Sequence, residues 1–337
     1  MPANLSPAYK TAEGQYRQAK DPQERLDALK EMLRAIPKHK GTEHLQADIK
    51  ARIKELTDEL AGPKKGGART GPTTFVKPDG AGQIALVGPP NSGKSALHVT
   101  LTGSHAHVGE YPFTTQFPLP GMMPVHDVAI QIIDLPPIAT EHPVPWISNV
   151  LHSADGCLLI VNLSEPGCVE RVVALHDLLN ERRVVLTDKW PADDGTADDE
   201  PDLFTKVLPT LLVASKSDRL DEAGDELAVL EELAGIAYPC QAVSAETGKG
   251  IAQLGIWLFD QLGVVRVYTK VPGKEADMNR PYTVSTGSTV RDVARLVHGE
   301  IAAQLKYARA WGASEFDAQQ VGADHVVEDG DILELHL

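Results

Sequence analysis

Residues 88–95 read GPPNSGKS and match the phosphate-binding pattern G-x-x-x-x-G-K-[ST] at each of its fixed positions. The apolar run 84–87 comes directly before them, and a stretch compatible with a helix follows from Ser95. In a loop between a strand and a helix, glycines let backbone N–H groups curl around a phosphate at the helix N-terminus. We therefore expect Lys94 to reach the β- and γ-phosphates of a nucleotide and the Ser95 hydroxyl to bind Mg²⁺.

Around this loop, short apolar runs alternate with helical or loop segments. This alternation predicts an α/β fold with a mostly parallel sheet and helices on both of its faces. Ligands of such sheets lie beyond the carboxyl ends of the strands, where the chemical motifs of this chain also fall. The acidic, turn-rich segment 188–202 shows no periodicity, and we interpret it as a solvated loop. The expected strands are 84–87, 129–134, 157–162, 210–214 and 240–243.

Two motifs that follow the last two of these runs favour guanine as the base. Residues 215–218 read SKSD, and the Asp218 carboxylate can accept hydrogen bonds from guanine N1–H and from its exocyclic amine. Adenine offers no such pair and would leave this carboxylate desolvated and unpaired. Residues 244–246 read SAE and can present a backbone N–H to guanine O6. The expected nucleotide is therefore GTP or GDP.

The flanking segments have other patterns. Residues 1–62 contain helical periodicity over 22–36 and 45–60, which predicts an N-terminal helical hairpin, and the Gly-, Pro- and Lys-rich stretch 63–82 is typical of a linker. After a nucleotide-binding domain at 83–263, residues 264–337 show strand patterns at 265–269, 281–284 and 332–337. A helix over 288–305, capped by Ser288, lies between the second and third of them. A small sheet over one helix predicts a C-terminal β-grasp module.

Charge and composition limit the class of protein. Lys+Arg minus Asp+Glu is 15 − 11 = +4 for residues 1–82, 9 − 25 = −16 for 83–263 and 8 − 11 = −3 for 264–337. The acidic middle disfavours nucleic acid over most of the surface, and we expect no DNA partner. No signal peptide and no apolar run of about 18 residues occurs, and the three cysteines lack a CxxC spacing. We therefore expect a cytoplasmic protein with free thiols and no membrane contact.

Five short motifs occur in the order of the G1 to G5 boxes of TRAFAC-class GTPases. They are GPPNSGKS, YPFTT at 111–115, DLPP at 134–137, SKSD and SAE. The YPFTT motif resembles that of the Obg family, and in particular its branch of developmentally regulated GTP-binding (DRG) proteins. Residues 36–60 are similar to the helical region that precedes the DRG G domain. Residues 265–298, followed by KYARAWG and VGADHVVEDGDILELH, resemble its TGS domain.

The resemblance assigns roles to residues of these motifs. Thr115, with Thr114 as the alternative, would be the switch I residue that follows Mg²⁺ and the γ-phosphate, and Asp134 would be an outer-sphere Mg²⁺ partner. Asn91 matches an asparagine that binds K⁺ in related GTPases, although asparagine is also ordinary in a left-handed turn. The candidate set is Lys94 and Thr115 for catalysis, Ser95, Thr115 and Asp134 for Mg²⁺, and Gly88, Asn91, Ser92, Gly93, Lys94, Ser95, Ala96, Lys216, Asp218, Ser244, Ala245 and Glu246 for the nucleotide.

The chain departs from the family pattern at two boxes. The third box should end in a glycine whose N–H senses the γ-phosphate, but Pro137 has no N–H and a fixed φ. Ile138 stands where some GTPases hold a water-orienting glutamine. An apolar residue at this position is usual in Obg relatives, and Glu141 or His142 could position water instead. Ser215 replaces the usual asparagine, whose amide braces the base site against the P-loop. We expect nucleotide binding to weaken, by about 1–2 kcal/mol if one hydrogen bond is lost.

These observations lead to two main hypotheses. The first is a Mg²⁺-dependent GTPase, with K⁺ as a further candidate cofactor, that hydrolyses GTP slowly. The resemblance implies that it works with ribosomes or RNA through its N-terminal helices and TGS domain. The second is a pseudo-GTPase scaffold that binds GTP or GDP without switching, because of Pro137. A third class, an ATP-dependent kinase, is disfavoured by Asp218 and by the lack of an identifiable phosphoacceptor site.

Overall fold

The computed structural model describes residues 5–37, 42–61, 75–104, 117–139, 144, 146–193, 202–219, 223–312 and 318–337. The chain divides into two compact units, Met1–Lys77 and Pro78–Leu337. Among the described residues, none of the helices combines the length and the apolar character that a membrane span requires. Four residues named in the sequence-based expectations, Thr114, Thr115, Glu141 and His142, lie outside the described residues.

The described part of the N-terminal unit contains three helices, and side chains cap the first two. The Ser6 hydroxyl accepts a hydrogen bond from Tyr9 N–H, and the Asp21 carboxylate accepts from the N–H groups of Gln23 and Glu24. Proline follows each cap, where its missing N–H leaves no hydrogen bond unmade. The helices are α1 (Pro7–Gln18), α2 (Pro22–Ala35) and α3 (Glu43–Ala61).

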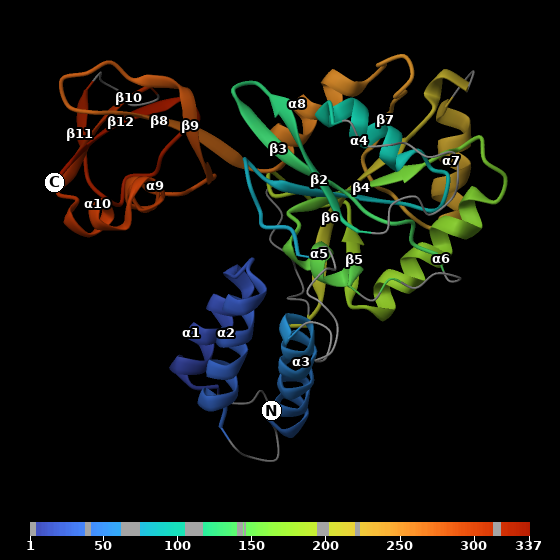
Figure 1. Cartoon of the computed structure of the whole chain (residues 1–337), viewed down its shortest axis with the longest axis horizontal. Coiled ribbons are helices and arrows are strands. Elements are labelled where there is room, and N and C mark those ends of the chain that lie inside the picture. The colour runs from blue at the N-terminus through green and yellow to red at the C-terminus, as the bar shows by residue number, and fades with distance from the viewer. Residues whose placement is uncertain are drawn as a thin grey trace. The chain divides into compact units, whose positions relative to one another are not determined.

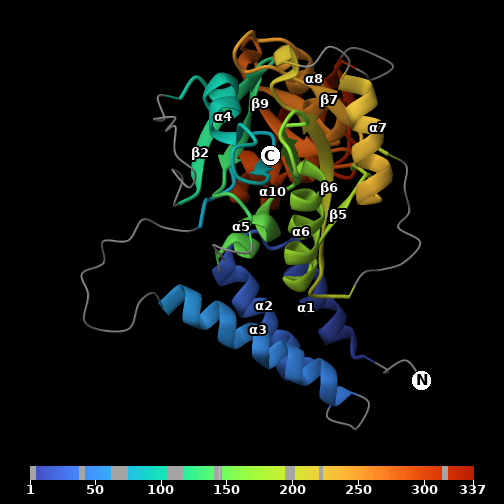
Figure 2. The same cartoon turned by 90° about the vertical axis from the view of Figure 1, so that its right-hand side faces the viewer.

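Helix α2 packs against both α1 and α3 (Figures 1 and 2). It buries Leu29 and Met32 completely, while α1 contributes the buried Tyr16 and α3 the buried Ile49. Apolar contacts of this kind supply most of the stability of short helices. The two helices expected from the sequence are α2 and α3. The structure adds α1, so the expected hairpin is part of a three-helix unit.

The second unit begins with a sheet of seven strands in its described residues, which we call the central sheet. Its order is β2-β3-β1-β4-β6-β5, with β7 beside β6. The β2–β3 pair is antiparallel and the other described pairs are parallel. The strands are β1 (Gln83–Val87), β2 (Leu119–Val125), β3 (Val128–Asp134), β4 (Gly156–Val161), β5 (Val184–Thr187), β6 (Lys206–Ala214) and β7 (Cys240–Ala242).

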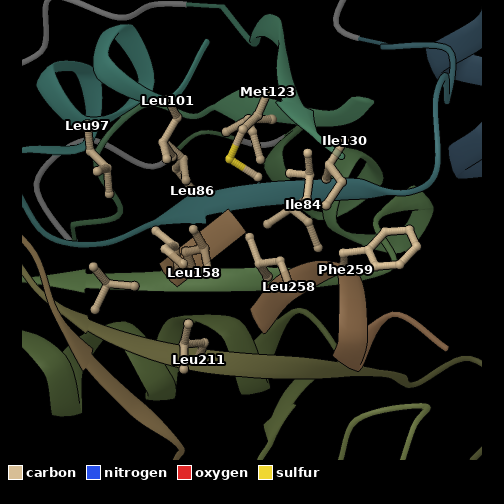
Figure 3. Packing of buried hydrophobic residues seen from close by; sticks show 14 of the residues in the cluster. Ile84, Leu86, Leu97, Leu101, Met123, Ile130, Leu158, Leu211, Leu258 and Phe259 are labelled. Atoms are coloured by element: carbon tan, nitrogen blue, oxygen red, sulfur yellow. The ribbon is translucent and has the colours of Figure 1, made fainter. Parts of the chain in front are cut away.

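Helices cover both faces of the central sheet (Figure 1). On one face, Leu97 and Leu101 from α4 and Leu258 and Phe259 from α8 join buried strand residues in a single apolar cluster (Figure 3). This packing holds the N-terminus of α4 at the carboxyl end of β1, so the loop between them is fixed by its flanking elements. The helices are α4 (Lys94–Thr102), α5 (Ile147–Ser153), α6 (Cys168–Glu181), α7 (Ala223–Ala234) and α8 (Ile251–Gln261), with a 3₁₀ turn at Ser217–Arg219.

A second sheet, which we call the C-terminal sheet, has the order β11-β10-β12-β8-β9. Strands β8 and β12 are parallel, and the other pairs are antiparallel. Val290 and Val293 from α9 lie in its apolar core, so a helix packs on one face as in a β-grasp fold. The elements are β8 (Val264–Lys270), β9 (Asp277–Ser285), α9 (Val290–Val297), α10 (Gly299–Gln304), β10 (Tyr307–Trp311), β11 (Gln319–Val321) and β12 (Asp331–His336).

The sequence-based expectation for the C-terminal helix is wrong in two details. The helix is not continuous over 288–305, because His298 adopts an extended backbone (φ −170°) that separates α9 from α10. Its N-cap is Thr289 rather than Ser288. Thr289 and Asp292 form a capping box, in which each side chain satisfies a backbone N–H of the other residue.

Candidate nucleotide-binding site

Three positions of the loop 88–93 have a restricted backbone. A Cβ on Gly88 would lie 2.4 Å from the carbonyl oxygen of Ile160 on β4, so a side chain there would collide with the sheet. Gly93 has a φ of +92° and forms the N-cap of α4. Asn91 is also left-handed, with a φ of 61°. These conformations turn the chain tightly around the N-terminus of α4, as a phosphate-binding loop requires.

Lys94 lies inside this loop and is buried. Its Nζ donates hydrogen bonds to the carbonyl oxygens of Gly88 (3.0 Å) and Pro89 (2.9 Å) and lies 3.3 Å from Ser92 Oγ. Burial lowers the pKa of Lys94 to about 8, although the nearby Asp134 carboxylate acts in the opposite direction. A phosphate in the loop would offer this ammonium group an anionic partner in place of two neutral carbonyls.

Ser95 and Asp134 form the polar contact next to Lys94. Ser95 Oγ donates to Asp134 Oδ2 at 2.6 Å, and the carboxylate is buried at the carboxyl end of β3. A hydroxyl and a carboxylate are oxygen donors that suit Mg²⁺, an ion that usually takes few protein ligands and completes its shell with phosphates and waters. Among the described residues, no group of three or more His, Cys, Asp or Glu side chains could hold a metal ion. The pair therefore fits Mg²⁺ only together with a nucleotide.

A cavity of about 130 Å³ lies next to α4 and to the segments that follow β6 and β7. The Ser244 hydroxyl donates to Asp218 and holds the pKa of that carboxyl below its ordinary value. The Ser244 N–H is already bonded to the carbonyl of Lys249, which leaves the N–H groups of Ala245 and Glu246 as the donors of the SAE motif without a backbone partner among the described residues. The cavity is lined by Gly93, Ala96, Leu97, Ser215, Lys216, Asp218, Arg219, Val243, Ser244, Ala245 and Glu246.

The structure therefore brings the predicted base-site residues together around one cavity and places Lys94, Ser95 and Asp134 beside it. Lys216 connects the two parts, because its Nζ donates to the carbonyl of Asn91 at 3.3 Å while its own backbone is left-handed (φ 55°). Arg219 also lines the cavity and was not among the predicted residues. The sequence signal that could have identified Arg219 is its position directly after Asp218.

Ser215 keeps the contact that its replacement of asparagine was expected to lose. Its Oγ donates to the carbonyl oxygen of Ser92 at 2.6 Å and also lies 3.2 Å from that of Val161. The side chain is buried, and a hydroxyl carries one hydrogen, so the shorter contact is the hydrogen bond. The expected loss of the link between the base site and the P-loop is therefore wrong. A serine at this position still joins the two.

The segment after β3 is packed against the P-loop. Leu135, Pro136 and Pro137 are buried, and the Ile138 N–H donates to the carbonyl of Gly88 at 3.3 Å. Pro137 offers no donor toward a phosphate, and the next donor along the chain is already engaged. Pro137 and Ile138, which would lie at the start of the switch II segment of a GTPase, therefore offer no free backbone N–H for contact with a γ-phosphate.

Comparisons with known families agree with this arrangement. Residues 83–189 match the family described as 50S ribosome-binding GTPase, and residues 265–337 match the family described as TGS domain. The first range contains the P-loop and the carboxyl end of β3, and the second contains the C-terminal sheet. The strand order and the two matches confirm the expected fold class.

Relatives cover most of the chain at modest identity. The chain is 25% identical to Developmentally-regulated G-protein 2 of Arabidopsis thaliana (93% of this chain, 90% of the relative) and 26% identical to Developmentally-regulated GTP-binding protein 1 of Xenopus laevis (92% and 98%). A GTP-binding protein of Methanocaldococcus jannaschii is 27% identical (92% of both chains). The solved YchF GTPase of Schizosaccharomyces pombe shares the fold at a TM-score of 0.52 and 13% identity, over 77% of this chain and 99% of that one. The resemblance stated from the motifs is thus confirmed: this chain joins a GTPase domain to a C-terminal TGS domain and is related to the developmentally regulated GTP-binding proteins.

Proposed function

We propose that this protein binds GTP and GDP and hydrolyses GTP slowly to GDP and phosphate. The observation that carries the proposal is the cavity beside the P-loop, which is lined by both Asp218 and Ala245. The carboxylate of Asp218 matches guanine N1–H and the exocyclic amine, and the Ala245 N–H matches guanine O6. Adenine has an acceptor at N1 and a donor at its 6-position, so both contacts would be mismatched.

Charge stabilisation would come from Lys94 and the backbone of the loop. On binding, Nζ would exchange its bonds to Gly88 and Pro89 for the β- and γ-phosphates, and the anion would favour the charged form of the lysine. The N–H groups at the start of α4 add to this field without having to reorganise. Catalysis would thus rest on positioning and electrostatics.

Mg²⁺ would supply positive charge beside the phosphates when it is bound. The Ser95 hydroxyl, which now donates to Asp134, is the residue we propose as its direct ligand, with Asp134 acting through a water. On the strength of the resemblance, Thr115 is proposed as the switch I ligand of Mg²⁺ and, together with Lys94, as a catalytic residue. Asn91 is proposed as a K⁺ ligand, and its left-handed turn is equally compatible with a purely structural role.

A second candidate function is favoured by a specific observation. Pro137 is buried and the Ile138 N–H is bonded to Gly88, so this segment lacks the donor through which GTPases couple the γ-phosphate to switch II. A pseudo-GTPase would bind GTP and GDP through the same site, and the bound nucleotide would stabilise a scaffold for other partners.

For partners, we propose the ribosome or RNA, with the contact made by the N-terminal helices and the TGS module in the cytoplasm. The description of the matching family, 50S ribosome-binding GTPase, supports this proposal. The net charge of residues 1–82, which is positive while that of residues 83–263 is strongly negative, also supports it. Co-sedimentation of the purified protein with ribosomes, compared with a variant that lacks residues 1–77, tests it.

The first experiment is single-turnover hydrolysis of GTP with Mg²⁺, in matched KCl and NaCl buffers. Lys94→Ala removes the phosphate-binding ammonium group, and Lys50→Ala, an exposed lysine on α3, is the matched control. Phosphate release that Lys94→Ala loses and Lys50→Ala keeps supports an enzyme, and faster release in KCl supports Asn91 as a K⁺ ligand. Binding of GTP without hydrolysis supports the scaffold, and equal binding of ATP contradicts the proposed guanine site.

A further inference from the structure

A polar cluster joins the turn of the β2–β3 hairpin to the first strand of the C-terminal sheet. The turn consists of residues 126–127, with His126 in a left-handed conformation (φ 52°). The Asp127 carboxylate accepts a hydrogen bond from Arg266 Nη1 at 2.7 Å and another from the Tyr268 hydroxyl. Both donors belong to β8, so a single side chain of the hairpin engages two residues of the next module.

Arg266 is held firmly on its other sides. Its Nε and Nη2 donate to the two carboxylate oxygens of Asp329 at 3.0 and 2.7 Å, and its backbone N–H donates to Asp329 at 2.7 Å. The guanidinium lies 5.3 Å from the centre of the Phe259 ring, and that ring also contacts His126 edge-on. A bidentate pair with a cation–π contact fixes the direction of the remaining donor. That donor is directed at Asp127.

The charges in this cluster are matched. Burial acts to raise the pKa of Asp127, but the hydrogen bonds from Tyr268 and Arg266 outweigh it, so the pKa lies below its ordinary value. The Arg266 guanidinium likewise lowers the pKa of Asp329. Both carboxylates are therefore ionised at neutral pH, and the cluster carries one cation between two anions.

The β2–β3 hairpin connects this cluster to the nucleotide site. Its seven paired positions run from Leu119↔Asp134 to Val125↔Val128. Asp134, which accepts from Ser95 at the proposed metal site, thus lies at one end of β3, and Asp127 lies just beyond the other end. The continuously paired ribbon is therefore a contiguous structural path between the two carboxylates.

We propose that Asp127 reports the occupancy of the nucleotide site to the C-terminal sheet, through its hydrogen bonds to Arg266 and Tyr268. The inference rests on the proposed nucleotide binding and extends it from the site to a regulated output. When nucleotide and metal draw Ser95 and Asp134 into a new arrangement, the hairpin shifts and the Asp127 contacts change in strength. The readout is the stability of β8 and of its pairing with β9.

The test is hydrogen exchange on the full chain, with and without Mg²⁺ and GDP, combined with a fluorescence titration of GDP on the same samples. Asp127→Ala removes both hydrogen bonds, and Tyr268→Phe removes one with little change in shape. Asp324→Ala is the matched control, because this exposed carboxylate pairs with Arg291 on the same module and not with the hairpin. We expect GDP to slow the exchange of β8 amides by about threefold or more in the wild type and in Asp324→Ala.

In Asp127→Ala the slowing of β8 exchange by GDP should fall to less than about half of the wild-type value, and in Tyr268→Phe it should be intermediate. The GDP affinity of both variants should stay within about twofold of the wild type. Unchanged exchange of β8 in wild-type protein that binds GDP overturns the inference and leaves nucleotide binding intact. A full response in Asp127→Ala also overturns it. If the titration finds no GDP binding, the proposed function fails, and the relay fails with it.

Discussion

The hydrogen bond between Ser215 and the P-loop gives the sharpest test of how this site is held together. Ser215→Ala removes a buried hydroxyl that donates to the carbonyl of Ser92 at 2.6 Å. The carbonyl then lies without that donor in a buried position, and the strand carrying the base motif loses its direct link to the phosphate loop. We expect the loop to sample other conformations before nucleotide binds.

The size of the effect follows from one buried hydrogen bond between neutral groups. Such a bond contributes about 1 kcal/mol, which corresponds to roughly a fivefold change in an equilibrium constant. Because the bond exists without nucleotide, its removal acts by lowering the fraction of molecules whose loop is competent to bind. The dissociation constant for GDP should therefore rise by about three- to tenfold, with the same factor for GTP.

Titration with a fluorescent GDP analogue measures this constant, and thermal unfolding is followed in parallel. The control is Ser153→Ala, which removes an equally buried hydroxyl 2.9 Å from Gln83 Oε1, in a cluster away from the P-loop. Both variants should lose stability, and only Ser215→Ala should lose affinity. A GDP affinity of Ser215→Ala within about 1.5-fold of the wild type would refute the bracing role.

Four other predictions follow from the packing of single residues. Gly88→Ala places a Cβ 2.4 Å from a carbonyl oxygen of β4 and should abolish GDP binding. Gly14→Ala places a Cβ with nothing within 4 Å and should raise the stability of α1 by about 0.5–1 kcal/mol. Equal melting temperatures of Gly14→Ala and the wild type would contradict the second prediction. Burial raises the pKa of Cys157 to about 12 and that of Cys240 to about 11, so iodoacetamide should label Cys168 first in the native protein. Equal labelling of the three in a peptide mass map would contradict this. Asp292→Ala removes half of the capping box of α9 and should speed hydrogen exchange there by an amount equivalent to about 1 kcal/mol, while unchanged exchange would show that the cap is not stabilising.

The strands that end at the site were predictable from the sequence because they are short, apolar and buried on both faces. Every residue of β1 and β4 is buried, and all of them except Gln83 are apolar or glycine, so each strand is a nearly continuous apolar run that ends where a polar motif begins. The edges of the sheet lacked this signal. Strand β2 contains Pro120 and Pro124 and exposes much of its length, and β5 has only four residues.

Helices were predictable where caps and apolar spacing agreed. An N-cap residue followed by proline predicts the start of α2 at Asp21 and Pro22. The same kind of pair, Ser6 and Pro7, stands at the start of α1, although few large apolar residues follow it. The break at His298 did have a marker, since Gly299 follows it directly and glycine is common just after a helix end, but the expected helix over 288–305 ran across it.

The site itself was only partly predictable, because spacing identifies residues but not the contacts between them. The P-loop, Asp218 and the SAE motif could be placed around one nucleotide, since each follows a strand of the same sheet. The hydrogen bond of Ser215 to the loop and the pairing of Asp127 with Arg266 join residues more than 100 positions apart. No sequence periodicity encodes such pairs.

The two departures from the family pattern have opposite consequences, and the difference lies in what each residue can donate. An asparagine amide and a serine hydroxyl both carry a hydrogen, so Ser215 can still bridge to the carbonyl of Ser92. A proline carries none on its nitrogen, so no rearrangement of Pro137 restores a bond to a γ-phosphate. Binding of the base and the β-phosphate should therefore survive in this chain, while the preference for GTP over GDP should be weak. Nucleotide binding and nucleotide sensing are then separable functions, and Pro137→Gly, which returns the N–H, is the substitution that should raise the affinity for GTP and leave that for GDP unchanged.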